Sequence, residues 1–174
     1  MTPLGHASIA LLVAETATKI FPYVNKNIIL TATTIGGVAV DLDLFYRFYQ
    51  KRSKVFDKTI GKHRFFPSHT PIATFIVSFF FMLINFYFGI FFFLGTLIHL
   101  FLDTLFFPEG INFLYPVSRK MTRSFYIKTH PFWAPKEISG VKDWHKHYLS
   151  SPLFWFFEVV PFIASIVVLF LIIK

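Results

Sequence analysis

PIATFIVSFFFMLINFYFGIFFFLGTLIHLFL, residues 71–102, is a run of 32 residues without a formal charge. An α-helix rises about 1.5 Å per residue, so this run is too long for one ordinary crossing of a bilayer. We therefore expect a helical hairpin that turns near Asn85–Gly89. Its two apolar helices would cover residues 71–86 and 88–107.

Three further apolar segments flank this hairpin, at residues 4–22, 27–46 and 152–173. Glu158 is an acid inside the last of them and is therefore a candidate partner for a cation. Hydrophobic residues make up 55% of the chain and charged residues 15%, whereas soluble domains hold about 45–50% and 25%. The pattern predicts one all-α domain over residues 1–174, a polytopic integral membrane bundle of about five apolar helices.

The positive charge is concentrated in two stretches between apolar segments. Of the 17 Lys and Arg residues, seven fall in residues 46–70 and seven in residues 108–151. Such loops are typical of cytoplasmic connections, and they attract anionic lipid headgroups. They would also attract nucleic acid, but burial beside lipid disfavours that partner. We expect a multi-pass protein of the cytoplasmic (inner) membrane with its amino terminus and both basic loops in the cytoplasm.

Histidine and aspartate residues gather at the ends of the apolar segments. Five alternating crossings would bring them all to the cytoplasmic face, where we expect a metal site. A charge at the bilayer centre costs about 2.5–3.5 kcal/mol, so such residues indicate function. The chain has no cysteine, which restricts metal ligands to His, Asp, Glu and water. The residues concerned are His6, Asp41, Asp43, His63, His69, His99 and Asp103.

Two local patterns suit metal ligation. His99 and Asp103 are four residues apart, so they share a helix face. Asp41 and Asp43 are two apart and diverge in a helix, so both can serve one site only if the helix ends or unwinds there. The glycines at positions 36 and 37 make such unwinding plausible. The structural alternatives are a His–Asp hydrogen bond between helices and a solvated helix end.

A third pattern, HRFFPSHTP at residues 63–71, precedes the hairpin. Ser68 or Thr70 can cap the helix that Pro71 begins. Arg64 is suited to bidentate contact with a phosphate or carboxylate. The alternative is a basic loop beside the membrane whose histidines, including His63, are incidental.

Together these residues resemble a known family, the membrane-bound metal-dependent hydrolases, which include the LexA-regulated inner-membrane proteins of bacteria. The resemblance covers about residues 5–116, whereas residues 117–174 hold a basic loop and the last apolar segment outside the pattern. Val40 stands where the family has proline, and the hydroxyl residues of Ser68-His69-Thr70 are exchanged, but neither departure removes a ligand. The matching residues are His6, Asp41, Asp43, His63, Arg64, His69, Gly95, His99 and Asp103.

The resemblance implies a hydrolase with one or two divalent metal ions, expected to be zinc, with manganese as the alternative. We expect it to cleave a phosphoester of a membrane lipid at the cytoplasmic surface, with Arg64 and His63 as the catalytic residues that hold the phosphate. The competing interpretation is a non-enzymatic scaffold or regulatory partner with a structural metal site. A transporter is disfavoured because its ionisable residues would line a path near the bilayer midplane. The expected metal ligands are His6, Asp41, Asp43, His69, His99 and Asp103.

Overall fold

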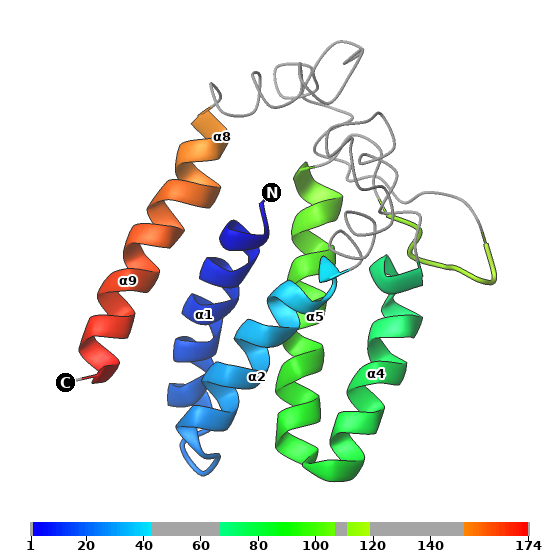
Figure 1. The fold of residues 1–174 in the computed structure, drawn as a ribbon, viewed down its shortest axis with the longest axis horizontal. Helices are drawn as coiled ribbons and strands as arrows, with labels where there is room; N and C mark the ends of the chain where they lie inside the picture. The colour runs from blue at the N-terminus through cyan, green and yellow to red at the C-terminus, as the bar shows by residue number, and fades with distance from the viewer. Residues whose placement is uncertain (1, 43–66, 107–110, 119–151, 174) are drawn as a thin grey trace, which may run out of the picture.

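The structure is a computed structural model that describes residues 2–42, 67–106, 111–118 and 152–173 (Figure 1). The elements formed by these ranges are all helical, which confirms the predicted all-α class. The elements are α1 (Pro3–Ile20), α2 (Lys26–Ala39), the 3₁₀ turn η2 (Pro67–His69), α4 (Pro71–Ile84), α5 (Phe86–Phe106), α8 (Pro152–Phe154), the π-helical turn η3 (Trp155–Val159) and α9 (Val160–Ile173).

Helix α5 is the centre of the bundle. It packs against α2 on one side and α4 on the other, while α1 lies against both α2 and α9 (Figure 1). The last three elements follow one another without a break and form a single long helix at the edge of the bundle. The chain therefore brings its first and last helices together.

The predicted hairpin is confirmed, and its turn consists of one residue, Asn85. The backbone N–H of Asn85 donates to the carbonyl of Phe81 at 2.8 Å, which closes α4. Its side-chain oxygen accepts the backbone N–H of Phe88 at 3.0 Å, which caps the start of α5. One side chain thus ends one helix and begins the next.

Threonine followed by proline begins both α1 and α4. The Thr2 hydroxyl accepts the backbone N–H of Gly5 at 3.2 Å, and the Thr70 hydroxyl accepts that of Ala73 at 3.3 Å. Proline at the first helical position suits these starts because its missing N–H would have no partner in the helix. Of the two predicted caps for α4, Thr70 is therefore the one used.

Helix α2 is shorter than the predicted segment, which ran to residue 46. It ends at Ala39, and Asp41 lies in the turn that follows, where its backbone N–H donates to the carbonyl of Val38 at 3.0 Å. The expected end of the helix before Asp41 is therefore confirmed, although Gly36 and Gly37 lie inside the helix and do not unwind it. Their function is instead in packing.

Glycines allow α2 and α5 to pack backbone against backbone. A Cβ atom at Gly36 would clash with the carbonyl oxygen of Phe92, and one at Gly95 would clash with that of Thr33. A Cβ atom at Gly37 would lie 2.6 Å from Cβ of Ala10 in α1. Because carbonyl groups of a helix cannot rotate away, larger residues would force the helices apart. This close approach fixes the position of α5 relative to α1 and α2.

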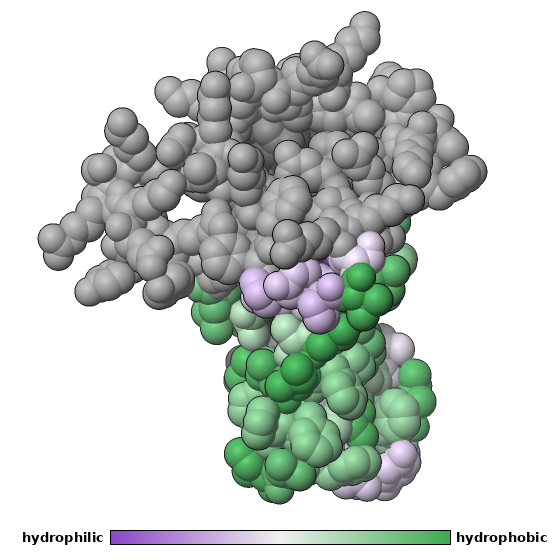
Figure 2. All heavy atoms as spheres, turned by 90° about the vertical axis from the view of Figure 1, so that its right-hand side faces the viewer, coloured by the Kyte–Doolittle hydropathy of each residue, from purple (hydrophilic) through white to green (hydrophobic). Residues whose placement is uncertain are grey.

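The outer surface of the bundle is apolar. Two helical stretches of the described chain, Phe86–Leu105 and Trp155–Ile172, are long and apolar enough to cross a membrane, and α4 is a shorter apolar helix. Phe80 and Leu83 of α4 are 62% and 67% exposed, and Figure 2 shows hydrophobic side chains covering this side of the molecule. Soluble proteins rarely expose apolar patches larger than a few hundred Å², so this surface is suited to lipid.

We expect Gly36→Ala and Gly95→Ala each to lower the midpoint of thermal unfolding in detergent. Overpacking a core costs about 1–3 kcal/mol, and each kcal/mol lowers Tm by roughly 2–4 °C for a chain of this size. Alanine is the better helix former, so a fall in Tm reports the clash itself. Ile35→Ala, on the exposed face of α2, is the control that should change Tm less. An unchanged or raised Tm in both glycine variants would contradict this packing.

Candidate metal centre

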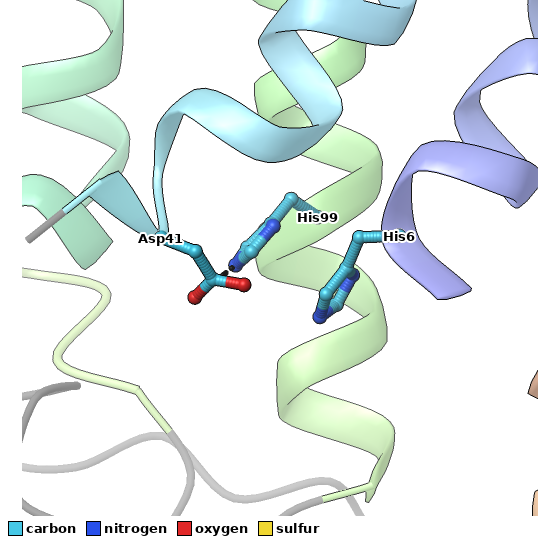
Figure 3. Close-up of side chains that lie close together, drawn as sticks. All are labelled: His6, Asp41 and His99. Atoms are coloured by element: carbon cyan, nitrogen blue, oxygen red, sulfur yellow. Dashed lines mark ion pairs between the residues drawn. The ribbon is translucent and has the colours of Figure 1, made fainter. Parts of the chain in front are cut away.

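Five buried ionisable side chains meet at one end of the bundle. His6 comes from the first turns of α1, Asp41 from the turn after α2, His69 from η2, and His99 and Asp103 from the last turns of α5. None of the five is more than 3% exposed. Figure 3 shows His6, Asp41 and His99 pointing toward one another. Four separate segments therefore contribute to one compact cluster.

This cluster contains five of the eight residues that the sequence predicts as metal-binding or catalytic. The other three, Asp43, His63 and Arg64, lie outside the described residues. In the sequence these five lie at expected helix ends or form an i, i+4 pair, and the hairpin and the start of α4 bring them to the same end of the bundle.

Four ligand atoms of the cluster are evenly spaced. Oδ1 of Asp41 lies 3.6 Å from Nε2 of both His69 and His99. Oδ2 of Asp103 lies 3.7 Å from the same two nitrogens. These separations are longer than an N–H···O hydrogen bond, which spans about 2.7–3.2 Å. At these atoms the side chains are within ion-pair distance if the rings are protonated, and they lie beyond the usual length of a hydrogen bond.

The same spacing fits ligands around a common ion. Zinc forms bonds of about 2.0–2.2 Å in a tetrahedral arrangement, which places its ligand atoms about 3.3–3.6 Å apart. The four distances above, 3.6 and 3.7 Å, lie close to this range. Ligand atoms of His6, Asp41 and His99 lie within 4.8 Å of one another, and so do those of His69, His99 and Asp103. Imidazole nitrogen and carboxylate oxygen are also suitable donors for zinc. The donor set and its spacing therefore fit a divalent metal ion.

The backbone of α2 orients the His99 ring. Nδ1 of His99 lies 2.8 Å from the carbonyl oxygen of Gly37, and because a carbonyl only accepts, Nδ1 carries the proton. In the neutral ring Nε2 is then the nitrogen with a free lone pair, and it makes no hydrogen bond within the described part of the chain. Metal-binding histidines usually donate their other ring nitrogen in this way. The close packing of Gly37 thus contributes directly to the cluster.

His6 occupies the other side of the Asp103 carboxylate. Its Nε2 lies 3.3 Å from Oδ1 of Asp103, the oxygen that does not face His69 and His99. Its ring stacks on that of His99, with centroids 3.8 Å apart and planes 23° apart. His6 can therefore orient Asp103 and His99, or bind an ion together with Asp41 and His99, whose ligand atoms lie within 4.8 Å of its own.

Asp41 lies in the turn after α2, outside the helices. Burial raises the pKa of the Asp41 carboxyl, but the hydrogen bond with His69 and the neighbouring His99 lower it more, to about 2. At neutral pH Asp41 is therefore ionised, which is the form that suits a metal ligand.

The charges of the cluster are compatible with a bound cation. Buried carboxylates are stable only when positive or hydrogen-bonding groups compensate them. Asp41 and Asp103 are both buried, and among the described residues their ion-pair partners are imidazoles. These rings can carry a proton and pair with the carboxylates, or bind the same metal ion as the carboxylates.

Sequence reasoning missed two groups that contact the cluster. The carbonyl of Gly37 is a backbone atom without a signature of its own, although its position in a Gly-Gly pair signals close packing. The hydroxyl of Ser68 lies 3.2 Å from Nδ1 of His69 and can fix that ring as Gly37 fixes His99. Ser68 was considered only as a helix cap.

Comparison with known proteins gives a family for the whole chain. A family model described as YdjM inner membrane protein matches residues 1–174. Neither a curated protein nor a solved structure matches the chain. The family description names a membrane location and no reaction, so hydrolysis stays a prediction. The lipid-suited surface and the family match agree: the chain belongs to the YdjM inner membrane protein family.

Proposed function

We propose that this protein is a metal-dependent hydrolase that cleaves a phosphoester, in a membrane lipid, at the cytoplasmic face of the inner membrane. The observation that carries the proposal is the arrangement of Asp41, His69, His99 and Asp103. Their four N···O separations of 3.6–3.7 Å are longer than hydrogen bonds and close to the spacing of ligands on a metal ion. Two overlapping sets of three, His6, Asp41 and His99 and His69, His99 and Asp103, each bring their ligand atoms within 4.8 Å. A buried polar network that served only to join helices would instead be expected to bond directly.

In this proposal the four residues hold one ion, and zinc is the expected metal. Asp43, two residues after Asp41 in the sequence, is the proposed additional ligand, and His6 orients Asp103 or joins a second ion. When bound, the divalent ion supplies Lewis acidity and lowers the pKa of a coordinated water toward about 7. The protein's own part is to fix the donor atoms, through the hydrogen bond from His99 to Gly37 and the contact between His6 and Asp103.

The position of the cluster supports a lipid substrate. It lies at one end of a bundle whose flank along α4 is apolar and exposed, so a lipid could reach the site from the side (Figure 2). The basic residues of 46–70, which connect α2 to α4 in sequence, would attract an anionic headgroup. Within that stretch, Arg64 is the proposed phosphate-binding residue, with His63 beside it.

One observation favours a second function, a scaffold with a structural metal site. Structural zinc sites are filled by four protein ligands, whereas catalytic sites keep a position open for water. Here Asp41, His69, His99 and Asp103 each bring a ligand atom to the cluster, and all four residues are buried. Metal binding without turnover would identify this function, so the two proposals differ in a measurable way.

The metal content of detergent-purified protein is the first test. We expect about one or two equivalents of zinc or manganese in the wild type, and a large loss in His69→Ala, His99→Ala and Asp103→Asn. Thr33→Val, a buried change of nearly equal volume in α2, is the matched control and should keep its metal. Metal-free wild type after gentle purification and reconstitution would refute the site.

Hydrolysis of lipid is the second test. Metal-loaded protein in vesicles of phosphatidylglycerol and phosphatidylethanolamine should release a phosphorylated or dephosphorylated product, detected by mass spectrometry. Loss of a residue that hydrogen-bonds to a metal ligand typically lowers activity by about 10–100-fold. Asp103 is itself a proposed ligand, so Asp103→Asn should lower the rate of hydrolysis by more than about 100-fold. Arg64→Ala should mainly raise KM, and Arg64→Lys should restore part of the loss. A metal-loaded protein that turns over no phospholipid would support the scaffold instead.

Membrane orientation gives a third test, which the absence of cysteine makes simple. Tyr23→Cys and Phe86→Cys lie at exposed positions at the end of the bundle away from the cluster, so we expect both to react with an impermeant maleimide in spheroplasts. Ser53→Cys, in the first basic stretch, should react only after permeabilisation. Labelling of Ser53→Cys in intact spheroplasts would contradict the proposed cytoplasmic position of the site.

A further inference from the structure

Glu158 is a buried acid in an otherwise uncharged helix. It lies in the π-helical turn η3 between α8 and α9 and is 6% exposed. An acid in a membrane helix is costly and therefore usually has a specific partner, and π-helical turns occur often at functional sites. The sequence suggests a cation as that partner; among the described residues, the hydrogen-bond partner of Glu158 is Thr2.

The carboxylate of Glu158 binds the first turn of α1. Oε1 accepts the backbone N–H of Thr2 at 2.6 Å, and Oε2 accepts the Thr2 hydroxyl at 2.6 Å. These residues are 156 positions apart in the chain. Both oxygens thus engage one residue, which is the geometry of a clamp and not of a single incidental contact.

Thr2 passes this restraint to His6. The Thr2 hydroxyl, while donating to Glu158, accepts the backbone N–H of Gly5, and the Thr2 carbonyl accepts the backbone N–H of His6 at 3.1 Å. One residue therefore connects the carboxylate in the last helix to the backbone of a residue in the cluster. The negative carboxylate also lies at the positive end of α1, where it is electrostatically favoured.

We propose that Glu158 is a positioning residue for the metal centre, holding the first turn of α1 so that His6 stays against Asp103 and His99. The proposal rests on the proposed metal binding. Helix ends open more readily than helix centres because their first backbone N–H groups have no partner within the helix. His6 is only four residues from the cap, so its position depends on that turn. The last helix is then part of the site's support and more than a membrane anchor.

Amide hydrogen exchange on metal-free, detergent-solubilised protein tests the clamp itself. Glu158→Ala should speed exchange in the peptide covering residues 3–8, while Glu158→Gln, whose amide can still accept from Thr2, should stay close to wild type. Ser165→Ala is the control, since Ser165 is buried in the same helix. Among the described residues, its hydroxyl donates to the backbone carbonyl of Phe162, one turn earlier in that helix. Thr2→Val removes the hydroxyl that donates to Glu158, so it should also speed exchange in the same peptide.

Metal affinity, measured by competition with a chelating dye for zinc, tests the positioning role. Outer partners of metal ligands typically contribute about 10–100-fold in affinity, so Glu158→Ala should weaken binding by that order, as should Thr2→Val. Glu158→Gln and Ser165→Ala should retain wild-type affinity. The loss of zinc affinity in His6→Ala is the largest loss that Glu158 could cause through His6. Because the two residues act through the same contact, adding Glu158→Ala to His6→Ala should lower the affinity little further.

The outcomes separate the two proposals. Wild type that binds no zinc would end the metal proposal, and the exchange measurement would still decide whether the clamp exists. Exchange in Glu158→Ala equal to that in Ser165→Ala would overturn the clamp. Faster exchange with unchanged zinc affinity would overturn the positioning role. If Glu158→Ala fails to fold, Thr2→Val and Glu158→Gln carry the same comparison.

Discussion

The structure depends on the burial of two carboxylates, Asp41 and Asp103, at one end of an apolar helical bundle. Taking such charges out of water is costly unless positive or hydrogen-bonding groups compensate them. The chain provides three imidazoles, from α1, η2 and α5 itself, at 3.3–3.7 Å from these carboxylates. A metal at this point would tie four segments together, so site and fold would stabilise each other.

The close packing of α2 on α5 makes this cluster possible. Gly36 and Gly95 remove the side chains that would hold the two backbones apart. The same approach places the carbonyl of Gly37 within reach of the His99 ring. Because Asp41 follows α2 and Asp103 lies in α5, a wider separation would move the two carboxylates apart. Small residues in the helix interior therefore determine the geometry of the polar end.

Features that depend on local sequence were predictable. The uncharged run predicts the hairpin, and Thr70 with Pro71 predicts the start of α4. The spacing of His99 and Asp103 predicts that both lie on one face of α5. The end of α2 before Asp41 was also anticipated, but for the wrong reason. In a sequence, the glycines of α2 indicate that the backbone is free to unwind. In the structure they lie against other helices, and a single sequence does not reveal which helices those are.

Contacts between distant segments could not be predicted in the same way. The bond from His99 to the Gly37 carbonyl joins residues 62 positions apart and uses a backbone atom that every residue has. The clamp between Thr2 and Glu158 joins the two ends of the described chain. The roles of Asp43, His63 and Arg64 stay predictions, since these residues lie outside the described ranges.

X-ray absorption spectroscopy of the zinc-loaded protein tests the central claim most directly. The account predicts a first shell of nitrogen and oxygen only, at about 2.0–2.2 Å, with outer-shell scattering from at least two imidazoles. That imidazole scattering should weaken in His99→Ala. A first shell of water oxygens without imidazole scattering would show that zinc binds elsewhere, and the cluster would then be a polar network between helices.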